Sequence, residues 1–283
     1  MIYISTGGFY NRNAYETSLE FQRNEIFNIE LSGGLFESSL IPNLKSLSSK
    51  LNFQIHNYFP PPSEPFVFNL ASQNKFISQK SFDHALNAIE IASDIGKGYY
   101  SFHAGFLLDL SVNELGKKVK KRPLNDRSKA VQIFIENINK LAKIAEQKGI
   151  KLLIENNVIS AKNYAEFKED PFLMTQSEEC IQVMQSVPNN VQMLVDLAHL
   201  KVSSNSLNFD AIEFLNKCDS WISAYHLSDN DGTRDSNEPF TKDSWFWPYI
   251  KKDLDYYSLE IYNHNPEVLI SQLKMAKIFL GRE

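Results

Sequence analysis

The chain has 283 residues, 43% of them hydrophobic and 22% charged, which is the balance of a globular protein that buries a sizeable core. Its formal net charge of −5, from 29 basic and 34 acidic residues, argues against the basic footprint of a nucleic-acid surface. No apolar run approaches the roughly 20 residues needed to cross a bilayer, so no membrane partner is expected.

The N-terminus and the cysteines bear on the cellular compartment expected for the protein. Strand-like residues follow Met1 directly, without the basic region and apolar core of a signal peptide, so we expect no cleaved leader. Cys180 and Cys218 lie far apart in the sequence and outside any CxxC pair. We therefore expect reduced core thiols in a cytoplasmic protein.

Eight strand-like runs alternate with helical patterns along the chain. The clearest helix is predicted over 126–148, where apolar residues recur at steps of three and four and form one stripe. The predicted strands cover residues 2–6, 26–31, 53–57, 99–103, 151–156, 192–196, 221–227 and 257–262. Alternation of this kind predicts an α/β fold, a (β/α)8 TIM barrel in a single domain over residues 1–283; an open doubly wound sheet is the alternative.

Glycines and capping residues mark the helix ends. Gly149 is expected to follow helix 126–148 in the left-handed conformation, and Gly96 to end helix 81–95 in the same way. Asn265–Pro266 forms an N-cap and first-turn pair that opens the last helix.

Two further helix starts are expected. Thr175 and Glu178 have the spacing of a capping box. The aromatic run Trp245–Phe246–Trp247 is expected to open a helix between the last two strands, as core or as a wall of a sugar site.

The connections have unequal lengths. Helix-to-strand connections are short, whereas the strand-to-helix connections 58–80, 104–125 and 228–242 are long. In a barrel the long loops then meet at the C-terminal face, where barrel enzymes keep their chemistry.

Four of the later strand-like runs end in polar residues able to bind a metal: Glu155, Asp196, His226 and Glu260. These residues would come from neighbouring strands of a barrel and form an oxygen-rich ligand set. That set suits one divalent metal ion, Mn, Co or Mg, with Zn not excluded. The alternative for each residue alone is a strand-end group that caps a helix or pairs with a lysine.

Four other residues could bind substrate at the same mouth. His199 lies one turn beyond Asp196 and could lean over the site or only cap its helix. His56 and His103 end the third and fourth strands and could bind substrate, hold a second metal or hydrogen-bond across the barrel. Arg234 could clamp a phosphate or hydroxyls, or be solvated surface charge.

These motifs are familiar as a set, in order and at strand ends: Leu–Ile–Glu155–Asn, Val–Asp196–Leu–Ala–His199, Tyr–His226–Leu–Ser–Asp229 and Leu–Glu260. The chain resembles the xylose-isomerase-like (β/α)8 barrels, a superfamily of sugar and sugar-phosphate isomerases and epimerases that also includes endonuclease IV-type barrels.

The resemblance implies a metal-dependent isomerase or epimerase. Residues at the four matching positions would hold one divalent metal ion, and Glu155 and Glu260 would also act as acid and base on opposite faces of a sugar. Proton transfer next to a carbonyl would pass through a metal-stabilised enediolate, and His199 would position a substrate oxygen. The partner implied is a small-molecule sugar or sugar phosphate, and barrels of this kind are frequently homo-oligomers.

Two alternatives remain open. A zinc-dependent phosphoesterase of the apurinic endonuclease kind would use His56, His103 and His199 in a three-zinc cluster. Its Asp–x–His pair appears here as Asp235–Ser236–Asn237, which removes a zinc ligand. The other alternative is a barrel without catalysis that binds a ligand.

Overall fold

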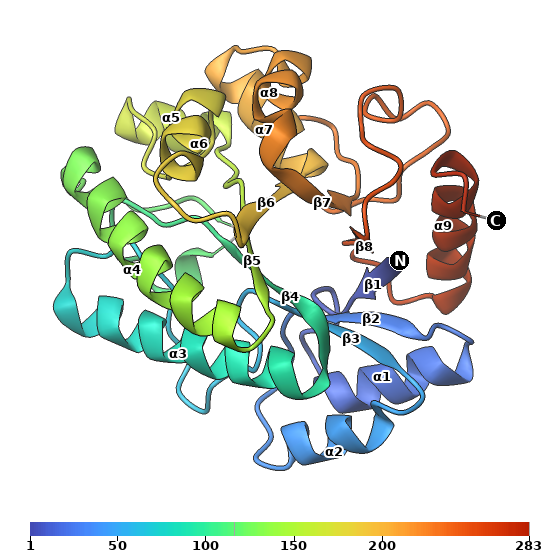
Figure 1. Ribbon diagram of the computed structural model, residues 1–283. Coiled ribbons are helices and arrows are strands. Elements are labelled where there is room, and N and C mark those ends of the chain that lie inside the picture. Colours follow the sequence, from blue (N-terminus) through green and yellow to red (C-terminus); the bar gives the residue numbers. More distant parts are fainter. Residues whose placement is uncertain (116, 283) are drawn as a thin grey trace.

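The strands form a closed parallel barrel in which each strand pairs with its neighbour in the chain and β8 returns to β1. The computed structural model describes residues 1–115 and 117–282. Figure 1 shows the helices arranged as a ring outside the strands. The predicted (β/α)8 barrel is therefore confirmed. The strands are β1 (Ile2–Ser5), β2 (Asn28–Leu31), β3 (Asn52–His56), β4 (Gly96–His103), β5 (Lys151–Glu155), β6 (Val191–Asp196), β7 (Ile222–Leu227) and β8 (Tyr256–Leu259).

The ring of helices is irregular. Two helices follow each of β5 and β6, and none of the described residues between β7 and β8 is helical. The helices are α1 (Ala14–Arg23), α2 (Leu40–Leu47), α3 (Lys75–Ile95), α4 (Arg127–Gln147), α5 (Ala161–Phe167), α6 (Ser177–Met184), α7 (Leu197–Leu207), α8 (Ala211–Cys218) and α9 (Pro266–Phe279), with 3-10 turns at Val112–Glu114 and Asp219–Trp221. None of the described helices is long and apolar enough to cross a bilayer.

The prediction of a helix that starts at Trp245 is wrong. Pro248 follows Trp247 and disfavours helical backbone at the preceding residue. The segment forms turns instead, and its aromatic residues are core. The Trp247 ring stacks on Phe279 of α9 with ring centroids 4.6 Å apart, and Phe246 and Trp247 are buried in the main core cluster.

Helix ends differ from the expected ones in two places. Helix α3 begins at Lys75, where Asn74 caps it, and Gly96 is extended (φ −81°, ψ −179°) because it already starts β4. Thr175 does not cap α6, since its hydroxyl donates to the carboxylate of Asp170. The left-handed Gly149 is confirmed, with φ 68°.

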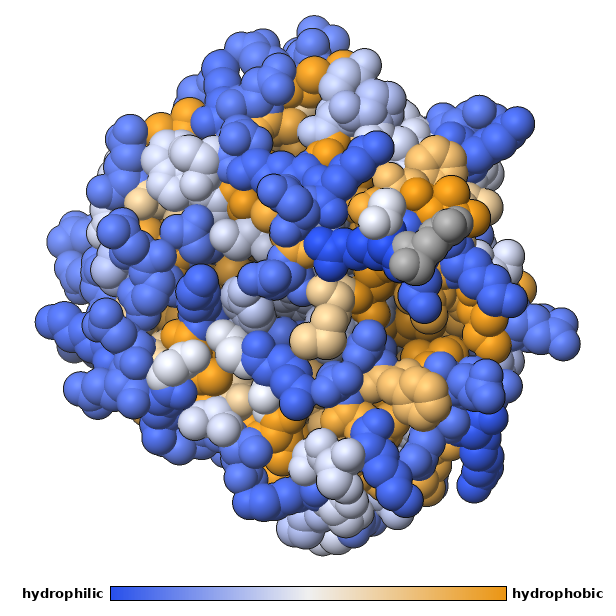
Figure 2. Space-filling view, turned by 45° about the vertical axis from the view of Figure 1, so that its right-hand side comes forward, coloured by the Kyte–Doolittle hydropathy of each residue, from blue (hydrophilic) through white to orange (hydrophobic). Residues whose placement is uncertain are grey.

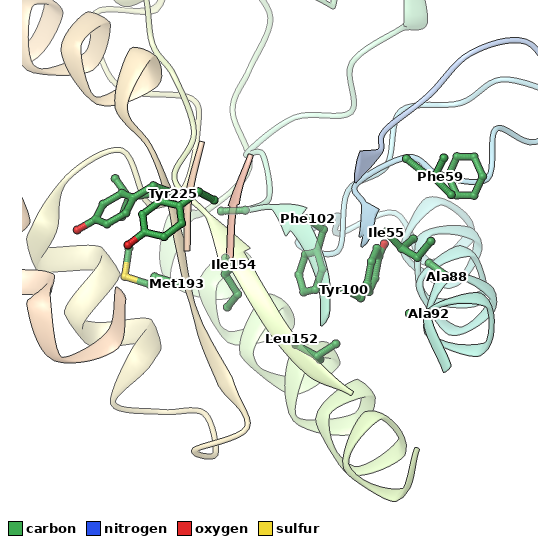
Figure 3. Packing of buried hydrophobic residues seen from close by; sticks show 14 of the residues in the cluster. Ile55, Phe59, Ala88, Ala92, Tyr100, Phe102, Leu152, Ile154, Met193 and Tyr225 are labelled. Atoms are coloured by element: carbon green, nitrogen blue, oxygen red, sulfur yellow. The ribbon is translucent and has the colours of Figure 1, made fainter. Parts of the chain in front are cut away.

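Side chains on each strand alternate between an outer layer and the barrel interior. Figure 3 shows the outer layer, in which Ile55 and Tyr100 point towards Ala88 and Ala92 of α3. The interior is filled by a separate apolar cluster of Tyr3, Leu153, Leu194, Ala224 and Tyr256. Two residues beyond the inward apolar residue of β5, β6 and β7, the next inward residue is polar on each of the three strands. This change from apolar to polar side chains creates the candidate site described below.

The face in Figure 2 is covered largely by hydrophilic side chains, with apolar areas between them.

Candidate metal and active site

The period of two along a strand places the candidate ligands at the C-terminal end of the barrel interior. Glu155, Asp196 and His226 each lie two residues beyond an inward apolar residue, and all three are fully buried. Glu260 follows β8 by one residue and is 6% exposed. The four side chains predicted to meet at one place therefore do so.

Their ligand atoms form one compact group. One atom from each of Glu155, Asp196, His226 and Glu260 lies within 4.8 Å of the others. His226 Nδ1 is central: it is 2.9 Å from Glu260 Oε2, 3.4 Å from Glu155 Oε1 and 3.6 Å from Asp196 Oδ2.

Several of these atoms are buried without a hydrogen-bond partner. They are both carboxylate oxygens of Glu155, Asp196 Oδ2 and His226 Nδ1. A buried polar atom without a partner costs free energy, and clustered carboxylates without a cation cost more. A divalent cation would satisfy one Glu155 oxygen, Asp196 Oδ2 and His226 Nδ1 together, so these residues fit a metal ion. Oxygen-rich sets with one imidazole suit Mn, Co, Mg or Zn.

Glu30, which the strand-end patterns did not indicate, orients the imidazole. Its side chain is fully buried in the barrel, and Glu30 Oε2 lies 2.9 Å from His226 Nε2. The Tyr256 hydroxyl also donates to Glu30. A carboxylate only accepts, so the proton sits on His226 Nε2, which leaves Nδ1 as the nitrogen that faces the other carboxylates. A carboxylate that fixes a histidine in this way is typical of metal sites.

The second oxygen of Glu155 faces a different pair of imidazoles. Glu155 Oε2 is 3.4 Å from His56 Nε2 and 3.4 Å from His103 Nδ1. Ligand atoms of these three residues also lie within 4.8 Å of one another, as do those of Glu30, His56 and His226. Glu155 thus stands between two groups of possible ligands.

His199 lies at the C-terminal mouth of the barrel, and hydrogen bonds hold both its backbone and its ring. Its backbone N–H donates to Asp196 Oδ1, so Asp196 caps α7 with one oxygen and points the other into the site. The ring lies with Nδ1 2.9 Å from the Asn156 carbonyl oxygen and Nε2 3.2 Å from Asp235 Oδ2. The contact with Asp235 was not foreseen from the sequence.

Solvent reaches the cluster from one side. The side chains of His103 and Asp235 are 26% and 25% exposed, whereas those of the four central residues are at most 8% exposed. Arg234 is exposed, and the structure does not bring it into the cluster.

Burial and neighbouring charges shift the protonation of the group. Burial raises the pKa of Glu155 to about 7 and also raises that of Glu260. Burial alone would lower the pKa of His226, but Glu30, Glu155 and Glu260 raise it well above its usual value. Burial opposes ionisation of Asp196 too, yet His199 and His226 bring its pKa to about 2. Without a metal ion, the imidazolium of His226 therefore supplies the positive charge that a cation would supply, and metal binding would release its proton.

A family model described as a xylose isomerase-like TIM barrel matches residues 27–277. No curated protein matches the chain. Among solved structures, a D-tagatose 3-epimerase-like protein is similar with a TM-score of 0.74 at 17% identity, covering 99% of this chain and 97% of that one.

Two other similar structures carry different descriptions. An AP endonuclease of family 2 from Brucella melitensis has a TM-score of 0.63 at 13% identity, covering 96% of this chain and 98% of its own. The IOLI protein with a bound zinc atom has a TM-score of 0.67 at 14% identity, covering 99% and 98%. Similarity at these identities shows the shared fold.

Proposed function

The chain belongs to the xylose isomerase-like TIM barrel family, and we propose that it is a divalent-metal-dependent isomerase or epimerase of a sugar or sugar phosphate. The observation that carries the proposal is the meeting of Glu155 and Glu260 with Asp196 and His226 in one buried group. The resemblance to a D-tagatose 3-epimerase-like protein supports it.

In this proposal Glu155, Asp196, His226 and Glu260 hold one metal ion. When bound, the ion polarises a carbonyl and stabilises the negative charge that develops on neighbouring oxygens. Glu155 removes a proton from the carbon next to the carbonyl, and Glu260 delivers a proton to the carbon that receives it. The substrate loses one proton and gains one, while Glu155 ends the step protonated and Glu260 ionised. Proton exchange with solvent then restores both carboxyl groups before the next turnover.

The surrounding residues bind and orient the sugar. Both ring nitrogens of His199 are engaged, Nδ1 with the Asn156 carbonyl oxygen and Nε2 with Asp235. His199 would therefore position a substrate oxygen through Nε2 by displacing Asp235. His56 and His103 donate or accept hydrogen bonds on the other side of Glu155, and Arg234 would reach only a substrate group that extends to the surface.

The test is exchange of carbon-bound hydrogen with solvent deuterium. Metal-loaded protein is incubated in D2O with a panel of keto- and aldopentoses, the corresponding hexoses and their phosphates, and deuterium is read by NMR. We expect exchange in at least one sugar and its loss in Glu155→Gln, with the fold retained. The matched control is Glu146→Gln, which changes an exposed carboxylate on α4. Exchange that persists in Glu155→Gln would show that the base is assigned wrongly.

A zinc-dependent phosphoesterase is the second candidate. It is favoured by His56 and His103 beside Glu155 Oε2, because a carboxylate between two ligand groups could bridge two metal ions. Asn237, which stands where that branch has a histidine, counts against it. Elemental mass spectrometry separates the candidates: one metal per chain supports the isomerase, whereas two or three zinc ions with cleavage of abasic duplex DNA support the phosphoesterase. A barrel that only binds a ligand would bind no metal tightly.

A further inference from the structure

The connection between β4 and α4 carries a concentrated positive charge. Five of the six residues 117–122 are Lys or Arg, in a protein whose net charge is −5. This segment lies at the C-terminal face of the barrel, because it follows β4, whose last residue is His103. We call Lys117, Lys120 and Lys121 the lysine patch.

The backbone of this segment is fixed. Val119 is 2% exposed within an apolar cluster that includes Ile159 and Phe167, and its N–H donates to Asn163 Oδ1 at 3.1 Å. The Lys120 N–H donates to Glu114 Oε1 at 3.0 Å. The chain is therefore anchored on both sides of the exposed side chains, and binding through them requires little further ordering.

Two of the five charges serve this anchoring and three do not. Arg122 pairs with Glu114 at 2.8 Å, and Lys118 pairs with Glu166 of α5 at 2.6 Å. Within residues 1–115 and 117–282, no ion pair holds the lysine patch, and its three side chains are exposed. These side chains are free to meet an external anion.

Apolar side chains are exposed beside the patch. Val112 and Leu115 are 44% and 47% exposed in the same loop, just before the lysines. Aliphatic side chains next to clustered lysines are the combination that binds at the interface of an anionic bilayer, where the first enter the acyl boundary and the second meet lipid phosphates.

A nucleic acid fits this surface less well. Proteins that bind single strands use aromatic side chains on which bases stack, and the sequence has no aromatic residue from 107 to 133. A phosphodiester backbone also gains nothing from exposed Val112 and Leu115. Beyond α5 a separate hollow has mixed charge with an acidic excess. Its charged lining residues are Arg127, Lys168, Glu169, Asp170, Glu178 and Glu179.

We propose that residues 112–115 and 117–122 dock the protein on an anionic lipid surface, with the lysine patch against lipid phosphates and Val112 and Leu115 in the interface. The rim of the barrel mouth next to His103 then faces the membrane. This docking is independent of the chemistry assigned to the metal site, so either can fail without the other.

The test is co-sedimentation with vesicles. The full-length protein is mixed with vesicles of phosphatidylcholine alone or of phosphatidylcholine and phosphatidylglycerol in equal parts, at low and at physiological ionic strength. We expect binding only to the anionic vesicles, weakened by salt. Replacing Lys117, Lys120 and Lys121 by Gln should lower the partition coefficient by on the order of 100-fold.

Two variants make the result specific. Gln at Lys140, Lys143 and Lys151, which are exposed at α4 and at the start of β5, removes the same charge elsewhere and should leave binding within about twofold. Leu115→Asn should weaken binding at both ionic strengths. Equal binding to both vesicle types, or an equal loss in the control, would overturn the proposal. So would binding of short duplex DNA through the lysine patch without binding of vesicles.

Discussion

Replacement of Glu30 by Gln tests whether the imidazole of His226 is a metal ligand. Glu30 is fully buried and takes no direct part in the group formed by Glu155, Asp196, His226 and Glu260. Its contact with that group is the 2.9 Å bond from His226 Nε2. Gln keeps an oxygen that can accept this bond and removes only the charge, so the fold should be retained.

The expected loss follows from the change in the hydrogen bond. A hydrogen bond to a charged group contributes about 1.5–3 kcal/mol and a neutral one about 1 kcal/mol. The difference of about 0.5–2 kcal/mol corresponds to a roughly 2- to 30-fold weaker metal affinity. Loss of carboxylate partners of metal-bound histidines typically costs 10- to 100-fold, which overlaps this range. We expect about a tenfold increase in Kd.

The affinity for Mn²⁺ and Zn²⁺ can be measured by competition with a fluorescent chelator. Glu146→Gln on the surface of α4 is the matched control and should bind as the unaltered protein does. His226→Ala should abolish tight binding. If Glu30→Gln folds and its Kd changes less than twofold, Glu30 does not orient a ligand, and the reasoning about the tautomer of His226 is wrong.

Three further predictions concern stability. Asp196→Ala should be about 1 kcal/mol less stable than Asp196→Asn in urea unfolding without metal, because only Asn retains the cap on α7; equal stability would contradict the cap. His84 is buried among aromatic rings, and burial lowers its pKa to about 4, below the unfolded value near 6.5. The free energy of unfolding is therefore unaffected by this group above about pH 6.5 and falls by up to about 3 kcal/mol as the pH falls towards 4, because the unfolded chain binds the proton first. The stability of His84→Leu should therefore fall less over this range, and parallel pH curves would refute the assignment. Phe134→Ala should lower the free energy of unfolding by about 3–5 kcal/mol, because Phe134 is fully buried on the inner face of α4. A loss below about 1 kcal/mol would show that the helix repacks.

The fold could be predicted from the sequence because the signal repeats along the whole chain. Each strand of a barrel is covered on its outer face and packed inside, so it is a short apolar run, and each helix returns the chain with a periodic stripe. The segment around Trp247 broke this regularity. Pro248 is a local signal against a helix there, but the path that the segment takes instead depends on stacking against Phe279 of α9, a contact between distant parts of the sequence.

The site was predictable where its residues lie at strand ends. Glu30 was missed because it lies inside a strand and not at its end. A carboxylate within the barrel strand Asn28–Leu31 is itself a signal, because both faces of the strand are buried and a buried charge requires a partner. Counting inward positions rather than strand ends would have found it. The contact of His199 with Asp235 could not be found in this way, because Asp235 lies in a loop whose course is set by packing.

The arrangement around Glu155 limits what the remaining histidines can do. Burial lowers the pKa of His56 to about 3 and holds that of His103 well below its usual value, so both rings are neutral at pH 7. Neutral imidazoles cannot balance the charge of Glu155, and this leaves His226, His199 or a cation to do so. His199 Nδ1 lies 3.4 Å from Glu155 Oε1, and although burial lowers the pKa of His199, Asp196 and Asp235 raise it well above its usual value. The neutral imidazoles can, however, bind a sugar hydroxyl or a second cation without electrostatic repulsion. Since one carboxylate serves both groups, a second cation would reduce the freedom of Glu155 to act as a base. The number of metal ions bound per chain therefore decides between proton transfer on a sugar and hydrolysis of a phosphoester.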